Sequence, residues 1–332
     1  MSLPRPTLGD DDVLRVVAGL RPCRRGGLRL EPERLEAGGA LKAVVHNYGH
    51  GGCGVTIAPG CAQLAADLAE EAAGEGPIAI AGAGVAGLTT ALELLQRGRR
   101  VVIYAERAGG ATTSALAGAL WLPTGIEFGS TEAEVARFRD IIARSKRAFA
   151  SMDRARWGVE RLAVYEPEGA PPADEFVAIG AIDQPRRLDR LPLAGPARSG
   201  RVYETDFIHT PRYLSVLRAE VERLGGRMVE RRFERPAEIA GLAEPVVVNC
   251  LGMAAGLLFG DEAMYPARGV LVHLRPQRLG YCVHDGYSYL FPREDALILG
   301  GTFEPGQWDL EPVEQIAAAI LAHHRRFFGE EA

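Results

Sequence analysis

The residues whose types and spacing could do chemistry begin with three closely spaced glycines. Gly82, Gly84 and Gly87 form a Gly-x-Gly-x-x-Gly run directly after an apolar segment. Between a strand and a helix, the first glycine permits a tight turn, the second lets the backbone approach a pyrophosphate, and the third lets helix and strand pack closely. The N-terminus of the helix then faces the phosphates. The run therefore predicts a dinucleotide-binding site.

An acidic residue at a suitable distance supports this interpretation. Glu106 follows a second apolar segment, roughly 20 residues beyond the glycines, where a carboxylate can accept a hydrogen bond from a ribose 2′-hydroxyl. The alternative is a chance turn in a chain with 40 glycines. That alternative does not account for the strand before the glycines, the helix after them and the acid beyond. The glycines alone do not distinguish FAD from NAD.

Two histidines and five cysteines raise the question of a metal or disulfide site. His46 and His50 are four residues apart, but five glycines lie among residues 49–60. We therefore expect a loop rather than a helix that presents both rings, and we predict no metal. The cysteines are odd in number and include no Cys-x-x-Cys pair. This pattern favours reduced thiols over a disulfide framework or a zinc site.

The elements that must position these residues follow from apolar periodicity and from glycine and proline breaks. The elements around the glycine run form a βαβ unit. Residues 166–200 are predicted to be mostly loop. Strands are expected at 13–17, 43–46, 78–81, 100–105, 246–249 and 296–300. Helices are expected at 58–73, 87–97, 131–154, 213–224 and 311–328.

Composition limits the class of protein. With 332 residues and 47% hydrophobic content, the chain can bury the core of one large or two closely packed domains. The net charge of -5 and the scattered arginines give no basic stripe, so no nucleic-acid partner is expected. No apolar run approaches the roughly 18 residues of a membrane span, and the first residues do not form a signal peptide. A cytoplasmic protein is expected.

Two longer segments resemble signatures of one family, in reversed order. Residues 44–56 resemble the carboxy-terminal signature of the D-amino-acid oxidase family, whereas residues 77–88 resemble its amino-terminal dinucleotide-binding strand. The resemblance implies a circular permutant of a complete FAD-dependent amino-acid oxidase, joined through residues 74–76. New termini are tolerated at surface connections. We therefore expect Met1 and Ala332 on the same side of one domain.

Further segments extend the resemblance over most of the chain and imply a fold. These segments are 111–114, 118–123, 210–214, 246–256 and 300–308, and the stretch 125–200 resembles nothing specific. The implied fold is α/β, with a Rossmann-like FAD-binding domain and a mixed, largely antiparallel substrate domain with helices. The FAD-binding domain is expected at residues 27–124 and 205–262, and the substrate-binding domain at 1–26, 125–204 and 263–332.

The resemblance also implies where FAD binds. A glycine-rich loop is expected to cap a helix near Ala58, with its N–H groups directed at the N1–C2=O edge of the flavin, where they stabilise negative charge. The implied contacts are Gly49, Gly51, Gly52, Gly54, Val55, Thr56, Gly82, Ala83, Gly84, Val85, Ala86, Gly87, Glu106, Arg107, Thr112, Thr113, Ser114, Gly118, Ala119, Leu120, Phe233 and Gly252.

Three residues are implied in binding the substrate. Arg21, in Gly-Leu-Arg-Pro, resembles the arginine that forks onto the substrate carboxylate, and Tyr289 resembles its tyrosine partner. Gly52 matches the residue whose carbonyl accepts from the substrate amine. The chain between His284 and Tyr289 is short, which implies a trimmed active-site lid. The expected pocket residues are Leu120, Leu122, Asp285, Tyr287 and Phe291.

The implied reaction is oxidative deamination of an α-amino acid, preferably a D-amino acid. A hydride passes from Cα to flavin N5, the imine hydrolyses, and molecular oxygen yields hydrogen peroxide. Two alternatives stay open. One is a glycine- or sarcosine-type amine oxidase, or a dehydrogenase with another acceptor, and the other is a flavin-binding protein without activity. A homodimer is also left open.

Overall fold

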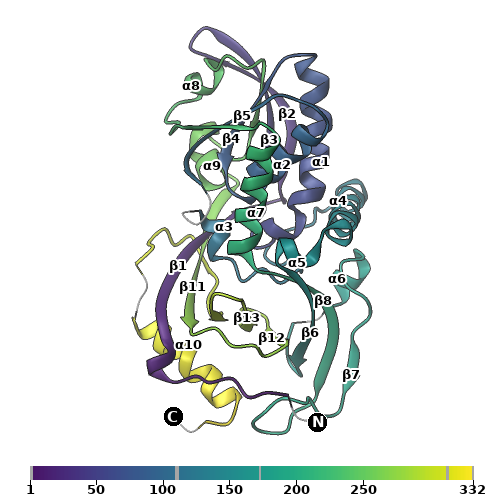
Figure 1. The fold of residues 1–332 in the computed structure, drawn as a ribbon, viewed down its shortest axis with the longest axis vertical. Coiled ribbons are helices and arrows are strands. Elements are labelled where there is room, and N and C mark those ends of the chain that lie inside the picture. The colour runs from purple at the N-terminus through teal and green to yellow at the C-terminus, as the bar shows by residue number, and fades with distance from the viewer. Residues whose placement is uncertain (1–2, 109–111, 172, 312–313, 331–332) are drawn as a thin grey trace.

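The computed structural model describes residues 3–108, 112–171, 173–311 and 314–330. Within them the chain forms two β-sheets, one at each end of an elongated molecule (Figure 1). Residue 111, at the start of the expected segment 111–114, and the terminal residues Met1 and Ala332 lie outside the described residues. The fold is mixed α/β.

The first sheet is parallel apart from one edge strand. Its order is β2-β3-β10-β4-β5-β9, and only β2 runs antiparallel to its neighbour. The strands are β2 (Arg29–Ala37), β3 (Ala40–Tyr48), β10 (Val246–Asn249), β4 (Ile78–Ala83), β5 (Val101–Ala108) and β9 (Arg227–Glu230).

Helices cover both faces of this sheet because its strands are apolar on both sides. Along β4, Ile78 and Ile80 join one buried cluster, whereas Ala79 and Ala81 join another. The first cluster includes residues of α1 (Gly54–Ala73), α2 (Val85–Gln96), α4 (Glu132–Ser151) and α7 (Thr210–Arg223). The second includes residues of α8 (Pro236–Ala240) and α9 (Met253–Phe259).

The second sheet is mostly antiparallel. Its order is β1-β11-β14-β13-β12-β6-β8-β7, with β15 also on β11, and only β12 and β6 pair in parallel. The strands are β1 (Val13–Arg24), β11 (Met264–Leu274), β14 (Leu297–Leu299), β13 (Ser288–Pro292), β12 (Tyr281–Asp285), β6 (Val159–Pro167), β8 (Gly200–Ile208), β7 (Arg186–Leu188) and β15 (Glu304–Pro305). The remaining helices are α3 (Thr113–Leu116), α5 (Arg154–Trp157), α6 (Asp174–Ala178), α10 (Glu314–Phe327) and the 3₁₀ turn Asp10–Asp12.

Several expected elements differ from the observed ones. The strand expected at 13–17 continues to Arg24, because β1 pairs with β11 over that whole length. The helix expected from Ala58 begins at Gly54. Residues 159–167 and 200–208, expected to be loop or unassigned, form the long pair β6 and β8. Such pairings depend on partners far away in the sequence.

The two sheets broadly follow the expected division into domains, which we keep as a proposal. Strand β8 crosses the expected boundary at residue 205. Helix α4, expected with the substrate domain, packs on α1 instead, where the Gly60 N–H donates to Ser145 Oγ at 2.9 Å. Ser145 is fully buried in this contact.

The two ends of the described chain lie together at the end of the molecule that carries the second sheet (Figure 1). Arg325 donates from Nε to the Leu8 carbonyl and from Nη2 to Asp10, both at 2.9 Å. Arg5 also donates to the Phe328 carbonyl. The first and last described segments are therefore in direct contact.

Candidate active site

A cavity of about 1050 Å³ extends between the two sheets and is lined by residues of both. At one end it reaches the glycine turn after β4 and the end of β5. At the other it reaches β1, β11, β12 and β13. One cavity therefore joins the predicted dinucleotide site to the predicted substrate residues.

Arg21 lies on β1 and enters the cavity across β11. Its Nη1 donates to the Thr302 carbonyl at 3.2 Å, and its guanidinium lies 5.6 Å from the centre of the Phe303 ring. Gly269 of β11 makes room for it, since a Cβ there would come within 2.4 Å of Arg21 Nη1. Among the described residues, Arg21 has no carboxylate partner, so its guanidinium remains available to an anion.

Tyr289 reaches the same part of the cavity from β13. A Cβ at Gly300 would come within 2.3 Å of its ring, and the ring stacks on Phe291 with centres 4.2 Å apart. Burial raises the pKa of the phenol, although the positive charge of Arg21 partly offsets this. Tyr289 therefore stays a neutral O–H donor near neutral pH, beside a fixed cation.

The loop before α1 brings the start of that helix to the cavity. The Gly51 N–H donates to the Pro22 carbonyl at 2.9 Å and the Gly52 N–H to the Gly125 carbonyl at 3.2 Å. Gly52 is exposed and lines the cavity, as do Val55 and Thr56. No side chain of the described residues caps this helix, so its first N–H groups and positive dipole end can meet a partial negative charge.

The glycine turn has the shape that its sequence predicts. Gly82 has a φ of +106°, which favours glycine, and a Cβ there would lie 2.4 Å from the Cys250 carbonyl oxygen. A Cβ at Gly87 would lie 2.0 Å from the Gly82 carbonyl oxygen. Gly84, Val85 and Ala86 line the cavity, and Ser114 Oγ accepts from the Val85 N–H at 3.1 Å.

The far end of the cavity contains the expected acid. Glu106 of β5 lines it together with Arg107 and Phe233, and lies 3.4 Å from Arg232. The turn, the uncapped helix and this acid lie along one cavity. The residues present therefore fit an extended dinucleotide with a flavin ring at the α1 end.

A strained segment forms another wall. Among the described residues, Ala119 is the one non-glycine residue with a positive φ, which is +55°. Its carbonyl accepts a hydrogen bond from the Ile208 N–H at 3.0 Å. Gly118 lies against the aromatic rings of β13, because a Cβ there would approach Phe291 to 2.6 Å. Both residues line the cavity, as do Thr112, Thr113, Leu120, Leu122 and Gly252.

Three expected site residues do not line the cavity. Gly49 and Gly87 lie outside the cavity lining. Each allows a close packing contact, Gly49 with the Arg24 side chain and Gly87 with the Gly82 carbonyl. Asp285 does not face the cavity, whereas its neighbour His284 does, because successive residues of a strand face opposite sides. Tyr287 does line the cavity, and it stacks on Phe303 with ring centres 4.6 Å apart.

Sequence reasoning missed one polar wall of the cavity. His284 and Glu166 line it, and Pro171 and Phe176 come from the stretch 125–200 that resembled nothing specific. The expected short connection is observed, since β12 and β13 are joined by the two residues Gly286 and Tyr287. Only the pairing of β6 with β12 reveals Glu166, and that pairing has no local sequence signal.

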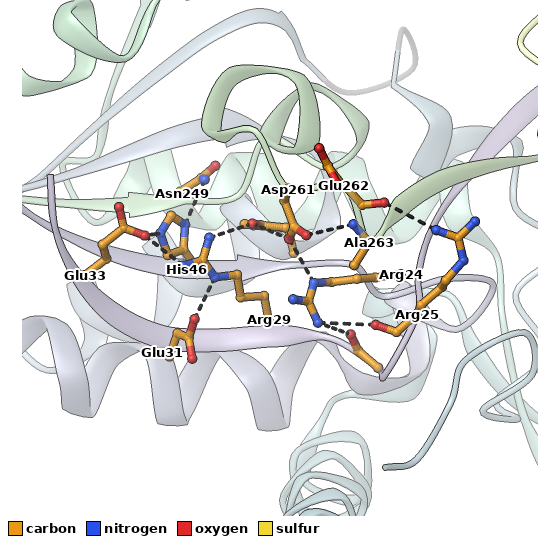
Figure 2. Close-up of polar contacts among 12 residues, drawn as sticks. Arg24, Arg25, Arg29, Glu31, Glu33, His46, Asn249, Asp261, Glu262 and Ala263 are labelled. Carbon is orange, nitrogen blue, oxygen red and sulfur yellow. Dashed lines mark hydrogen bonds and ion pairs between the residues drawn. The ribbon is translucent and has the colours of Figure 1, made fainter. Parts of the chain in front are cut away.

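A polar network joins residues of β2 and β3 to Asn249 and to Asp261 (Figure 2). His46 lies 3.0 Å from Glu33 through Nε2 and 3.1 Å from the Asn249 amide nitrogen through Nδ1. Asn249 in turn accepts from the N–H of Leu251, a cavity residue, at 3.2 Å. Nearby, Asp261 accepts from Arg24 at 2.8 Å.

Both histidines that raised the question of a metal are hydrogen-bonded to other side chains. His50 Nε2 lies 3.0 Å from the Asn47 side-chain oxygen, and burial lowers its pKa to about 4. In the described part of the chain, no three His, Cys, Asp or Glu side chains are grouped to hold a metal ion. All five cysteines are buried free thiols.

Comparison with known proteins gives consistent matches. The model of the family described as FAD dependent oxidoreductase matches residues 3–68 and 77–332. The D-amino-acid oxidase of Streptomyces coelicolor is 31% identical over 74% of this chain and 76% of its own. That of Rubrobacter xylanophilus is 33% identical over 73% and 74%.

A solved structure also matches the mixed α/β fold. The glycine oxidase of Geobacillus kaustophilus matches with a TM-score of 0.58 and 19% identity, over 76% of this chain and 77% of its own.

None of the helices in the described ranges combines the length and apolar character needed to cross a membrane.

Proposed function

The chain belongs to the FAD-dependent oxidoreductase family, and we propose that within it the protein oxidises α-amino acids, with D-amino acids preferred. FAD is its cofactor. The observation that carries the proposal is the single cavity that joins the glycine turn to Arg21 and Tyr289. The names of the relatives that cover about three quarters of the chain point to the same substrate class.

In this proposal Arg21 and Tyr289 hold the substrate carboxylate. The guanidinium offers two parallel N–H donors and the neutral phenol offers a third, so the carboxylate is fixed in orientation as well as position. The rings of Phe303 and Phe291 hold the two side chains in place.

The Gly52 carbonyl is proposed to accept from the substrate amine. Amine and carboxylate contacts together would direct Cα toward the cofactor, and such orientation supplies much of the rate of a two-reactant step. Bound FAD supplies the acceptor for the hydride leaving Cα, and the imine product hydrolyses while oxygen is reduced to hydrogen peroxide. The uncapped start of α1 would stabilise negative charge at the ring.

Circular permutation is part of the proposal. The family match covers residues 3–68 and 77–332 in chain order, and its gap ends one residue before β4. The residues between them, 69–76, cover the end of α1 and the predicted junction. Contact between the first and last described segments also supports a chain whose original ends were joined and reopened elsewhere.

A glycine- or sarcosine-type amine oxidase is the second candidate. The two-residue turn between β12 and β13 favours it, because it leaves no lid to enclose a large side chain. Against it, Leu122, Phe291 and His284 line space beyond Arg21 and Tyr289 that these small substrates would leave empty.

Anaerobic reduction of the flavin tests these alternatives. We expect the flavin absorbance of the holoprotein to bleach with a pool of D-amino acids and not with separate pools of L-amino acids, glycine or sarcosine. Bleaching only with glycine or sarcosine would support the second candidate. A flavin that none of the pools bleaches would refute amino-acid oxidation, and a peroxide assay in air would separate an oxidase from a dehydrogenase.

A further inference from the structure

A row of four polar side chains crosses the second sheet, beginning at the carboxylate-binding residue Tyr289. Tyr289 of β13 pairs with His284 of β12, and Glu166 of β6 pairs with Arg201 of β8. Because Val283 pairs with Tyr165 in the parallel ladder, the next residues, His284 and Glu166, lie side by side. Cross-strand partners share one face, and both His284 and Glu166 line the cavity.

Both carboxylate oxygens of Glu166 already have hydrogen-bond partners in the protein. Its Oε1 lies 2.7 Å from His284 Nδ1 and accepts from the Tyr203 hydroxyl at 3.1 Å, while Oε2 accepts from Arg201 Nε at 2.5 Å. Glu166 is only 3% exposed. Burial raises its pKa, but the contacts with His284 and Arg201 outweigh this and hold the pKa below its usual range. Glu166 is therefore a fixed carboxylate behind His284.

His284 is the member of the row with a free nitrogen. Since Nδ1 donates to Glu166, the tautomer is set, and Nε2 has no hydrogen-bond partner among the described residues. The imidazole ring is stacked on Phe291 with ring centres 6.5 Å apart and an angle of 10° between them. A buried ring that is fixed on both sides, with one nitrogen left for the cavity, is suited to recognising a ligand.

We propose that His284 binds the side-chain end of the substrate and that the preferred substrates carry a short side chain ending in a carboxylate. The proposal rests on the function proposed above, because it takes Arg21 and Tyr289 to hold the α-carboxylate. His284 lies one strand from Tyr289, about 5 Å in the sheet. Only a short side chain can bridge these two positions.

Charge balance favours a carboxylate over an ammonium group. Arg201 and Glu166 cancel each other, and Tyr203 and Tyr289 are neutral phenols. A substrate carboxylate would form a charge-assisted hydrogen bond with the imidazolium form of His284, whose positive charge Glu166 would stabilise from behind the ring. Arg293, which also lies near Tyr289, is paired with Asp295, and the charge of Arg21 would be neutralised by the α-carboxylate. An ammonium side chain would find the oxygens of Glu166 already occupied.

Substrate specificity gives the first test. The holoprotein should oxidise D-aspartate or D-glutamate with a higher kcat/KM than D-alanine or D-asparagine. His284→Gln should lower kcat/KM for the acidic substrates about 10- to 100-fold, the range expected for a lost charge-assisted hydrogen bond, and leave D-alanine within about threefold. Asp285→Asn, which changes the next residue on the opposite side of β12, is the matched control and should leave the preference unchanged.

Binding of substrate analogues gives a test that does not depend on turnover. Succinate and butyrate have the same length, but only succinate has a second carboxylate. Titration calorimetry should show that succinate binds at least about tenfold more tightly than butyrate to the natural protein, and that His284→Gln removes most of this difference. Butyrate should bind equally well to both proteins.

The outcomes separate this inference from the proposed function. If D-alanine reduces the flavin while acidic substrates do not, or if His284→Gln affects all substrates equally, His284 does not select a carboxylate and the inference is overturned. Equal rates with D-asparagine and D-aspartate would also overturn it. If no amino acid reduces the flavin but succinate binds more tightly than butyrate and this difference depends on His284, the proposed reaction fails while the recognition site stands.

Discussion

Arg21 and Tyr289 each lie against a glycine, and these contacts determine where their polar ends can go. Gly269 and Gly300 leave room that any side chain would fill. Arg21→Lys keeps the charge but loses the planar pair of donors, so the carboxylate loses at least one charge-assisted bond of about 1.5–3 kcal/mol. We expect kcat/KM for the substrate to fall about 10- to 100-fold, measured by steady-state kinetics.

The same variant should bind FAD as the natural protein does, because Arg21 lies at the substrate end of the cavity. The flavin spectrum and the FAD dissociation constant are therefore the controls. Unchanged kinetics in Arg21→Lys would show that the substrate carboxylate binds elsewhere. Loss of flavin from the variant would instead assign Arg21 to the cofactor site.

At the scale of elements, the turn between β4 and α2 depends on a glycine that does not line the cavity. A Cβ at Gly87 would lie 2.0 Å from the Gly82 carbonyl oxygen, so Gly87→Ala must push the helix away from the strand. We expect FAD affinity to fall at least about tenfold, measured by quenching of flavin fluorescence, because the N-terminus of α2 moves from the phosphates.

Gly241→Ala is the matched control for this prediction. Gly241 follows α8 with a φ of −81°, and its nearest neighbour would lie 3.3 Å from an added Cβ. This variant should keep the FAD affinity of the natural protein. Equal FAD affinity in both variants would contradict the role assigned to Gly87.

The same turn shows how much could be predicted from the sequence. The β4–α2–β5 unit and the spacing from Gly82 to Glu106 follow from local periodicity, and both strands and the helix between them were expected within a few residues. The helix start at Gly54 was expected later, because glycine disfavours helices. Burial of α1 against β3, α2 and α4 outweighs that preference.

The polar wall of the cavity could not be predicted in this way. His284 and Glu166 are 118 residues apart and meet only because β6 adds to β12 in parallel. Which of His284 and Asp285 faces the cavity depends on the register of a hairpin, and a shift of one residue would exchange them. Neither register nor sheet order has a local signal in this part of the chain.

For the whole molecule, buried histidines predict loss of stability in acid. Burial lowers the pKa of His50, His273 and His324 from 6.5 to about 4. Between pH 6.5 and 4 the unfolded chain therefore binds more protons than the folded protein, so stability falls as pH falls. We expect the free energy of unfolding to be lower at pH 5 than at pH 7.5, by about 2 kcal/mol for each histidine.

Urea unfolding of the holoprotein at the two pH values measures this effect. His324→Gln removes one titrating group and keeps a donor for the Gly300 carbonyl, 3.3 Å from His324 Nε2. The difference between the two pH values should be smaller in this variant. A free energy of unfolding that does not change with pH would contradict the lowered pKa values of these histidines in the folded protein.

The order of the segments leads to a prediction about the entire chain. If the protein is a circular permutant, a chain of residues 77–332, a short glycine-serine linker and residues 1–75 should fold to the same structure. The linker is short because Arg5 and Arg325 already hold the two described ends together. We expect the reordered protein to bind FAD, to show the same flavin spectrum and to melt within about 5 °C of the natural one, since only loop closure changes.

A second opening tests whether the site of the cut matters. Opening the joined chain between Val270 and Leu271 breaks β11 where it is buried and paired with β1. This chain should be insoluble or bind no FAD, because new termini are tolerated at exposed connections and not within central strands. If the chain that begins at Pro77 also fails while its linker is long enough, residues 74–76 are not a junction, and the order of segments has another origin than permutation.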